Sequence, residues 1–225
     1  METNLLIVLG PTASGKTRLG VELARELGGE IVSADSRQVY RGLDIGAGKD
    51  LEEYSVGGPP VPYHLIDIVD LDVEFSVFDF QKRFFTVFGE LEARGKTPIV
   101  VGGSGLYLES ILSESRLVEV PEDAGLRAEL EDEPTERLIE RLRGLKKVHN
   151  RTDLEDRGRL VRAIEIAEYS AQHEPEPGPA IRALVLGIRW DRRVLRDRIG
   201  RRLAERIREG LIDEVQRLHD DGVSW

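Results

Sequence analysis

The feature that most constrains the fold is a glycine-rich segment at residues 10–17, with the sequence GPTASGKT. It matches the phosphate-binding pattern G-x-x-x-x-G-K-[ST] at every fixed position. The apolar run at residues 5–9 precedes it, and apolar residues at helical spacing follow it as far as Leu27. A strand, a glycine-rich loop and a helix in this order form a P-loop, whose backbone N–H groups and helix N-terminus surround phosphate oxygens. We therefore expect a phosphate-binding α/β fold.

Each part of this loop has an expected task. Its backbone is expected to bind phosphate, the Lys16 ammonium to supply a point charge, and the Thr17 hydroxyl to hold Mg²⁺. The predicted ligand-binding residues of the loop are Gly10, Pro11, Thr12, Ala13, Ser14, Gly15, Lys16 and Thr17.

Short apolar runs alternate with helical patterns along the rest of the chain. Residues 30–34, 97–101 and 183–187 are predicted strands, and residues 63–69 form a possible further extended segment. Ser76 and Asp79 have the spacing of a capping box, which predicts a helix from there to about Arg94. Alternating strands and helices imply a parallel sheet with right-handed crossovers. The predicted fold class is α/β, a P-loop NTPase-like parallel sheet flanked by helices.

Three segments are expected. Residues 1–112 form the P-loop α/β core, and residues 113–179 form a small helical insertion that ends in a proline-rich linker. Residues 180–225 return to the core as a strand and an arginine-rich helix at 191–209. Within the insertion, residues 113–171 are expected to be helical throughout.

Composition excludes several classes of protein. The chain has no cysteine, so structural disulfides and thiolate zinc sites are excluded. Its longest early apolar stretch is too short for a signal peptide or a membrane span, and we expect a cytoplasmic, monomeric protein without a membrane partner. The net charge of −10 argues against a protein that coats nucleic acid, yet residues 181–217 hold 11 arginines and 6 acids. That stretch is either a face that docks a polyanion or an ordinary ion-paired helix.

The P-loop alone does not specify the reaction. An ATPase or GTPase normally has a second strand that ends in a magnesium-binding Asp, whereas the 97–101 strand runs into Gly102, Gly103, Ser104 and Gly105. Asp35 instead follows the 30–34 strand, at the edge where open α/β sheets bind ligands. Its carboxylate is a candidate general base or magnesium ligand, or it simply caps the following turn.

Five segments together resemble one family. They are residues 10–17, residues 33–46 (SADSRQVYRGLDIG), residues 63–67 (YHLID), residues 76–81 (SVFDFQ) and residues 102–107 (GGSGLY). Their order and spacing are similar to those of the bacterial tRNA dimethylallyltransferases, and weaker similarity continues at residues 159–165 and 187–215. The resemblance implies transfer of a dimethylallyl group from dimethylallyl diphosphate to the exocyclic amine of the adenosine beside the anticodon of tRNA.

The resemblance also implies roles for individual residues. The P-loop would hold the diphosphate of the prenyl donor with Mg²⁺, Asp35 would accept the proton of the amine, and Thr12 and Ser104 would line the reaction pocket with Lys16. Arg198 and Arg202 resemble arginines that close over the diphosphate, with an exposed ion-paired face as the alternative. The predicted tRNA contacts are Asp35, Ser36, Arg37, Gln38, Ser104 and Arg159, and Tyr40 and Tyr107 are candidates to receive the target base or to pack in the core.

Two departures from the family pattern bear on activity. Gly158 stands where relatives usually have a glutamine that touches tRNA, and the sequence stops at Trp225 where relatives continue, so we expect a shortened chain. Three alternatives to the tRNA enzyme therefore stay open. They are an adenylate isopentenyltransferase acting on free AMP, ADP or ATP, a small-molecule P-loop kinase, and a truncated non-catalytic relative that binds diphosphate or RNA.

Overall fold

The computed structural model describes residues 3–146, 154 and 156–223 of the 225-residue chain. These residues form two compact units. The first consists of Met1–Glu114 and Pro179–Trp225, and the second of Ser115–Gly178. The end at Trp225, which the sequence marks as a departure from the family pattern, lies outside the described residues.

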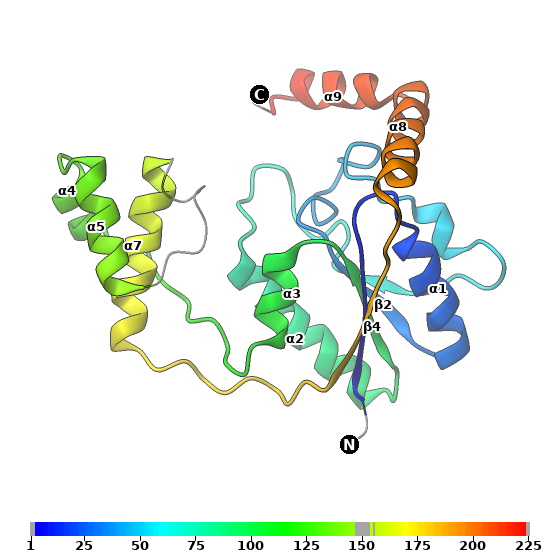
Figure 1. Ribbon diagram of the computed structural model, residues 1–225, viewed down its shortest axis with the longest axis horizontal. Helices are drawn as coiled ribbons and strands as arrows, with labels where there is room; N and C mark the ends of the chain where they lie inside the picture. Colours follow the sequence, from blue (N-terminus) through cyan, green and yellow to red (C-terminus); the bar gives the residue numbers. More distant parts are fainter. Residues whose placement is uncertain (1–2, 147–153, 155, 224–225) are drawn as a thin grey trace. The chain divides into compact units, whose positions relative to one another are not determined.

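A five-stranded sheet forms the centre of the first unit (Figure 1). All its pairings are parallel, in the spatial order β3 (Tyr63–His64), β2 (Glu30–Ala34), β4 (Pro98–Gly102), β1 (Leu5–Leu9) and β5 (Ala183–Gly187). Strands β1, β2 and β4 are buried along almost their whole length, which explains their continuous apolar sequences. The predicted parallel α/β sheet is confirmed. The expected segment at 63–69 contributes a strand of only two residues.

Helices cover both faces of this sheet (Figure 1). On one face, α1 (Lys16–Leu27) packs Val21 and Ala24 against β2 and β4. On the other face, α2 (Val77–Ala93) and α3 (Gly105–Leu112) share a core that includes Phe80 and Phe84. The phenylalanines of α2 recur at helical spacing, so burying one face of this helix places their rings together.

The predicted start and end of α2 are confirmed. The Ser76 hydroxyl accepts a hydrogen bond from the Asp79 N–H at 3.2 Å, and the Asp79 carboxylate accepts one from the Ser76 N–H at 2.9 Å. After α2, Gly95 takes a left-handed conformation with φ of 64°. Both ends follow from local chemistry, because the capping box satisfies two free donors and glycine adopts positive φ without steric cost.

Segments distant in sequence meet above the P-loop. Between β2 and β3 the chain forms a loop at residues 44–50, termed the 44–50 loop, followed by the 3-10 helix η1 (Leu51–Tyr54). After β5 come α8 (Arg192–Arg208) and α9 (Leu211–Asp220). Glu214 of α9 is buried, and its carboxylate accepts hydrogen bonds from the backbone N–H groups of residues 44, 45 and 46 at 2.7 to 2.9 Å. This carboxylate fixes the 44–50 loop to α9.

The second unit is helical. It contains α4 (Ala124–Leu130), α5 (Thr135–Leu145) and α7 (Arg157–Gln172), which share a core of leucines and Ile164. The expectation of helix throughout residues 113–171 was wrong in two places, because residues 113–123 and residues 131–134 contain no helix. In the first of these places the chain is extended, and the Arg116 N–H donates to the carbonyl oxygen of Glu176 at 2.9 Å.

The second unit also contains an ion cluster around the buried carboxylate of Glu165. The Glu165 carboxylate accepts from the Asp123 N–H at 3.0 Å, from Arg127 at 2.8 Å and from Arg162 at 3.0 Å. Burial alone would raise the pKa of Glu165, but these hydrogen bonds outweigh it and lower the pKa to about 2. The carboxylate is therefore held ionised inside this unit.

Candidate functional site

The P-loop joins β1 to α1 and has the geometry of an anion-binding turn. Gly15 precedes the helix with φ of 88°, and Ala13 also has positive φ, at 59°. Left-handed residues at such a turn direct successive backbone N–H groups into the concave side of the loop. Lys16 lies half-buried over it, with Nζ 3.4 Å from the carbonyl oxygen of Pro11. Burial lowers the pKa of the Lys16 ammonium, and the charge of Asp35 opposes part of that shift.

A pocket of about 330 Å³, termed the sheet-edge pocket, opens where β2 and β4 end. Its size lies at the lower end of the roughly 300–1,000 Å³ usual for small-molecule sites. It brings together most of the residues predicted from the sequence, namely Gly10, Pro11, Thr12, Lys16, Thr17, Asp35, Ser36, Gln38, Ser104 and Arg202. Residues from four separate segments thus face one cavity.

Close backbone approaches shape this pocket. A Cβ atom on Gly102 would lie 2.2 Å from the carbonyl oxygen of Ala34, and one on Gly103 would lie 3.0 Å from that of Gly10. The two glycines therefore let the ends of β1, β2 and β4 come together. Ser104 follows them and begins α3, which places its side chain at the pocket wall.

Asp35 stands directly after β2, inside the sheet-edge pocket. One oxygen, Oδ1, accepts a hydrogen bond from the N–H of Arg37 at 2.9 Å. The turn-capping interpretation of this residue is therefore correct, and it is compatible with a chemical role because Oδ2 accepts no hydrogen bond from the residues that the structure describes. Arg37 itself is exposed and lines neither this pocket nor the one beneath α8 in the described part of the chain.

Gln38 is held on both sides of its amide. Its Oε1 accepts from the Ser33 hydroxyl at 2.8 Å, and its Nε2 donates to the carbonyl oxygen of Gly48 at 3.0 Å. The side chain therefore links the end of β2 to the 44–50 loop. A contact from Gln38 to a nucleotide, as the family resemblance implies, would have to share these partners.

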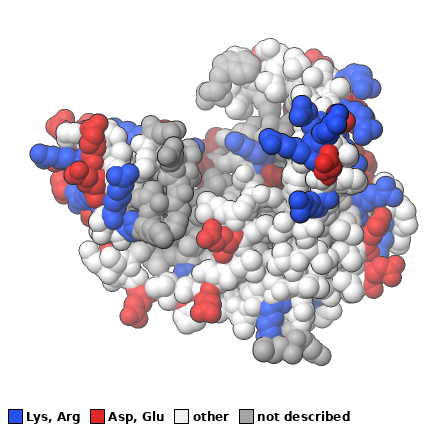
Figure 2. Space-filling model, viewed as in Figure 1, with Lys and Arg blue, Asp and Glu red and all other residues white. Residues whose placement is uncertain are grey.

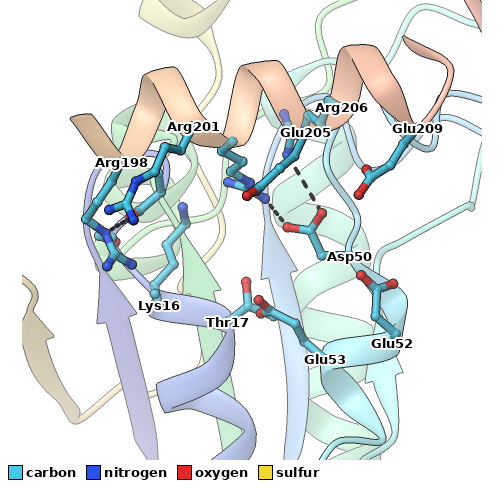
Figure 3. Close-up of a pocket in the computed structure, with 14 residues that line it drawn as sticks. Lys16, Thr17, Asp50, Glu52, Glu53, Arg198, Arg201, Glu205, Arg206 and Glu209 are labelled. Atoms are coloured by element: carbon cyan, nitrogen blue, oxygen red, sulfur yellow. Dashed lines mark hydrogen bonds and ion pairs between the residues drawn. The ribbon is translucent and has the colours of Figure 1, made fainter. Parts of the chain in front are cut away.

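Helix α8 places its arginines over the P-loop (Figure 3). The Nε of Arg198 donates to the carbonyl oxygen of Ala13 at 2.7 Å, and Nη1 of Arg202 donates to the Thr12 hydroxyl at 3.3 Å. Trp190 supports this contact, because its indole N–H donates to the carbonyl oxygen of Ser14 at 2.9 Å and its ring lies 4.7 Å from the Arg198 guanidinium. Both arginines are partly buried against the P-loop rather than on a fully exposed face, although Arg202 also forms an ion pair, with Asp50.

A second pocket, termed the α8 pocket, lies between this helix and the P-loop. It is lined by residues 13–17, by Asp50, Glu52 and Glu53, and by α8 residues including Arg198, Arg201, Arg202 and Arg206 (Figure 3). Figure 2 shows Lys and Arg side chains gathered at the same end of the first unit. The pocket shares Lys16, Thr17, Arg202 and Arg206 with the sheet-edge pocket, so the two are adjoining parts of one site.

Sequence reasoning missed the 44–50 loop as part of this site. Asp50 forms ion pairs with Arg202 and Arg206. The fully buried Lys49 pairs with Asp44 at 2.6 Å and with Asp67. Two signals were present in the sequence, the paired glycines at 46 and 48 and a lysine beside an aspartate. Neither showed that residues near 200 would lie opposite.

The aromatic candidates divide between core and site. Tyr107 is 5% exposed and stacks on Phe80 with ring centroids 4.0 Å apart, and burial raises the pKa of its hydroxyl to about 12. Core packing is therefore the correct interpretation of Tyr107. Tyr40 is partly buried and pairs with Val69 as an isolated bridge. Tyr54, which sequence reasoning did not select, forms part of the sheet-edge pocket.

Arg159 belongs to the second unit, where its N–H is capped by the Asp156 carboxylate at 2.8 Å. Its predicted contact with tRNA stays a prediction.

Among residues 3–146, 154 and 156–223, no helix combines the length and apolarity that a membrane crossing requires. The same residues contain no cluster of three or more His, Asp or Glu side chains able to hold a metal. A magnesium ion here would depend on Thr17, waters and ligand oxygens, which is how Mg²⁺ is commonly bound beside phosphates.

The sequence of the chain also matches known protein families and individual proteins. The family model "IPP transferase" matches residues 38–225, and "Isopentenyl transferase" matches residues 3–57. The chain is 58% identical over 226 residues to "tRNA dimethylallyltransferase 1" of Geotalea uraniireducens (100% of this chain, 74% of the relative). It is 60% identical over 227 residues to "tRNA dimethylallyltransferase 2" of Syntrophotalea carbinolica (100% and 75%).

A solved structure is also similar. The full-length tRNA isopentenylpyrophosphate transferase of Bacillus halodurans superimposes with a TM-score of 0.68 at 36% identity, covering 99% of this chain and 72% of that one. The sequence resemblance is confirmed by these matches, which span both the P-loop and the arginine-rich helix. The chain belongs to the IPP transferase family.

Proposed function

We propose that this protein transfers a dimethylallyl group from dimethylallyl diphosphate to the exocyclic amine of the adenosine beside the anticodon of tRNA. The amine nitrogen bonds to C1 of the prenyl group, and the bond from C1 to the diphosphate oxygen breaks. Its electron pair leaves with the diphosphate, and the amine proton passes to the Asp35 carboxylate. The names of the similar proteins and the family membership support this reaction.

One structural observation carries the proposal. A P-loop with its lysine and a carboxylate with an available oxygen face the same sheet-edge pocket. A P-loop nucleotide hydrolase would be expected to end a second strand in a magnesium-binding acid, whereas β4 ends at Gly102 and is followed by Gly103. This arrangement suits a diphosphate leaving group beside a base better than it suits attack of water on a nucleotide.

The cationic groups act on the leaving group. Negative charge builds on the diphosphate as the C1–O bond breaks, so cations fixed beside it stabilise the transition state more than the ground state. Lys16, Arg198 and Arg202 converge on the P-loop and supply this charge. Thr17 would hold Mg²⁺, which contributes further charge neutralisation at the diphosphate when bound.

The acceptor side of the pocket is formed by Asp35, Ser36, Gln38 and Ser104. We propose that Thr12 and Ser104 line the reaction pocket and that Asp35, Ser36, Arg37, Gln38 and Ser104 contact the target nucleotide. Arg159 would bind tRNA elsewhere. The target base must leave its stack to reach such a pocket. A tRNA substrate implies a cytoplasmic location, and we propose that the protein acts as a monomer.

The test is transfer of radiolabel from dimethylallyl diphosphate, in the presence of Mg²⁺, to two acceptors offered separately. One is an anticodon stem-loop with adenosine at the target position, and the other is AMP. We expect label in the stem-loop and none in AMP. Label in AMP alone would assign the protein to the adenylate class, and binding of diphosphate without label in either acceptor would identify a non-catalytic relative.

A further inference from the structure

Arg206 lies one helical turn after Arg202 and lines both the α8 pocket and the sheet-edge pocket. Its side chain is 17% exposed, and in the described part of the chain its buried Nε has no hydrogen-bond partner. Burial, followed by the nearby charge of Arg202, lowers the pKa of Arg206. A buried guanidinium N–H without an acceptor is costly unless an anion completes its hydrogen bonds.

The protein makes room for this side chain. A Cβ atom on Gly48 would lie 1.5 Å from Nη2 and 2.4 Å from Cζ of Arg206, so the guanidinium packs directly against the glycine backbone. The same Cβ would lie 3.0 Å from Nη2 of Arg202. The glycine, which has φ of 61°, therefore lets two guanidinium groups lie beside each other under the 44–50 loop.

These two guanidiniums share a single carboxylate. Asp50 pairs through Oδ2 with Arg202, while its Oδ1 lies 3.9 Å from Nη2 of Arg206, beyond hydrogen-bond distance (Figure 3). The α8 pocket also contains the carboxylates of Glu52, Glu53, Glu205 and Glu209, but among the described residues Asp50 is the carboxylate within ion-pair distance of Arg202 and Arg206. The oxygens of an incoming diphosphate would supply the hydrogen-bond acceptor that Nε of Arg206 lacks among the described residues.

We propose that Arg206 is a further diphosphate-binding residue and that Asp50 occupies part of the position of the diphosphate until the prenyl donor enters. When the donor binds, its diphosphate oxygens replace the Asp50 carboxylate at Arg202 and complete the hydrogen bonds of Arg206. The inference deepens the proposed function and rests on it for the identity of the donor. It adds an arginine and a competing carboxylate to the P-loop, Lys16, Arg198 and Arg202.

The test is calorimetric titration of inorganic pyrophosphate, with Mg²⁺ present, into the wild-type chain, four single variants and one double variant. Arg206→Gln should weaken binding by about tenfold to a hundredfold, the range expected for a lost charged hydrogen bond. Arg206→Lys restores the charge and should recover part of the affinity. Arg208→Gln, a change on the same helix outside both pockets, should bind pyrophosphate as the wild type does.

Substitution of Asp50 distinguishes the proposed competition with the diphosphate from a purely structural role of its ion pairs. If Asp50 competes with the diphosphate, Asp50→Asn should tighten pyrophosphate binding by about threefold to tenfold, and adding Arg206→Gln should remove most of that gain. Weaker binding in Asp50→Asn would mean that the ion pairs only shape the pocket, and would overturn the proposal. Unchanged pyrophosphate binding in Arg206→Gln would overturn it as well.

Two further readouts separate this inference from its alternatives. The anticodon stem-loop should bind Arg206→Gln as tightly as the wild type, because a loss of RNA affinity without a loss of pyrophosphate affinity would assign Arg206 to an RNA phosphate. If the wild type transfers the prenyl group and Arg206→Gln binds pyrophosphate normally, the inference about Arg206 is refuted and the proposed function stands. If pyrophosphate binding depends on Arg206 but the wild type transfers no prenyl group to any acceptor, the inference stands and the proposed function is refuted.

Discussion

The buried carboxylate of Glu214 offers a sharp test of how the end of the chain shapes the site. Its two oxygens accept three N–H hydrogen bonds from residues 44, 45 and 46. Glu214→Gln preserves size but replaces one acceptor oxygen by an NH₂ group. At least one of these partly buried loop N–H groups must then face a donor, and the remaining bonds lose the assistance of the negative charge.

The expected cost follows from these contacts. Leaving one buried donor unsatisfied costs about 1–3 kcal/mol, and charge-assisted bonds are about twice as strong as neutral ones. Together these terms give roughly 2–4 kcal/mol for opening the 44–50 loop. Because 1.4 kcal/mol corresponds to a tenfold change, the opening equilibrium should rise about 30-fold to 1,000-fold.

Native-state amide hydrogen exchange measures this opening directly. The amides of residues 44, 45 and 46 should exchange faster by that factor in Glu214→Gln, while amides of α2 keep their wild-type rates. Asp213→Asn, at the exposed neighbouring position on α9, is the matched control and should change exchange at the loop by less than about 0.5 kcal/mol. Loop exchange in Glu214→Gln that matches this control would refute the assigned role of the carboxylate.

Four further outcomes are expected. Asp35→Asn should slow prenyl transfer about 10²-fold to 10⁴-fold, as removal of a general base does, while pyrophosphate affinity measured by calorimetry stays near wild type. Prenyl transfer at the wild-type rate would show that Asp35 is not the general base. Lys16→Ala should weaken pyrophosphate binding by about tenfold to a hundredfold in the same titration, and an unchanged constant would contradict its assignment. The pKa of Glu165 is lowered to about 2 from an ordinary value of 4.5, so its ionised form stabilises the fold above about pH 5. This contribution, on the order of 3 kcal/mol, is lost as the pH falls toward 2. Urea unfolding against pH should be flatter in Glu165→Gln over that range, and identical slopes would refute the account. Gly102→Ala should lower stability by about 1–3 kcal/mol in the same unfolding assay, because its Cβ would lie 2.2 Å from the carbonyl oxygen of Ala34; a loss below about 0.5 kcal/mol would contradict the close approach.

Local chemistry made much of the fold predictable from the sequence. The P-loop pattern fixed the order of β1, loop and α1, and the Ser76 capping box located the start of α2. Continuous apolar runs identified the buried strands, since strands covered on both faces need no polar alternation. Asp35 could be placed at the sheet edge because it directly follows one of these strands.

The rest of the site depends on contacts between distant segments. Arg202 and Asp50 are 152 residues apart, and Glu214 lies 168 to 170 residues from the amides that it binds. No local pattern marks such pairs, because each side chain would be equally suited to an exposed surface. Tyr107 shows the opposite error. Because it lies in a segment that resembles the family's site motif, it was a candidate to receive the target base, whereas in the structure it packs in the core against Phe80.

The most direct test of the proposed reaction is mass spectrometry of the acceptor after incubation with dimethylallyl diphosphate and Mg²⁺. The anticodon stem-loop is digested to nucleosides, and the adenosine beside the anticodon is compared with the other adenosines. We predict a mass increase of one C₅H₈ unit on the base of that adenosine alone. Unmodified adenosine at that position, from a chain that binds pyrophosphate and stem-loop normally, would contradict the proposed function.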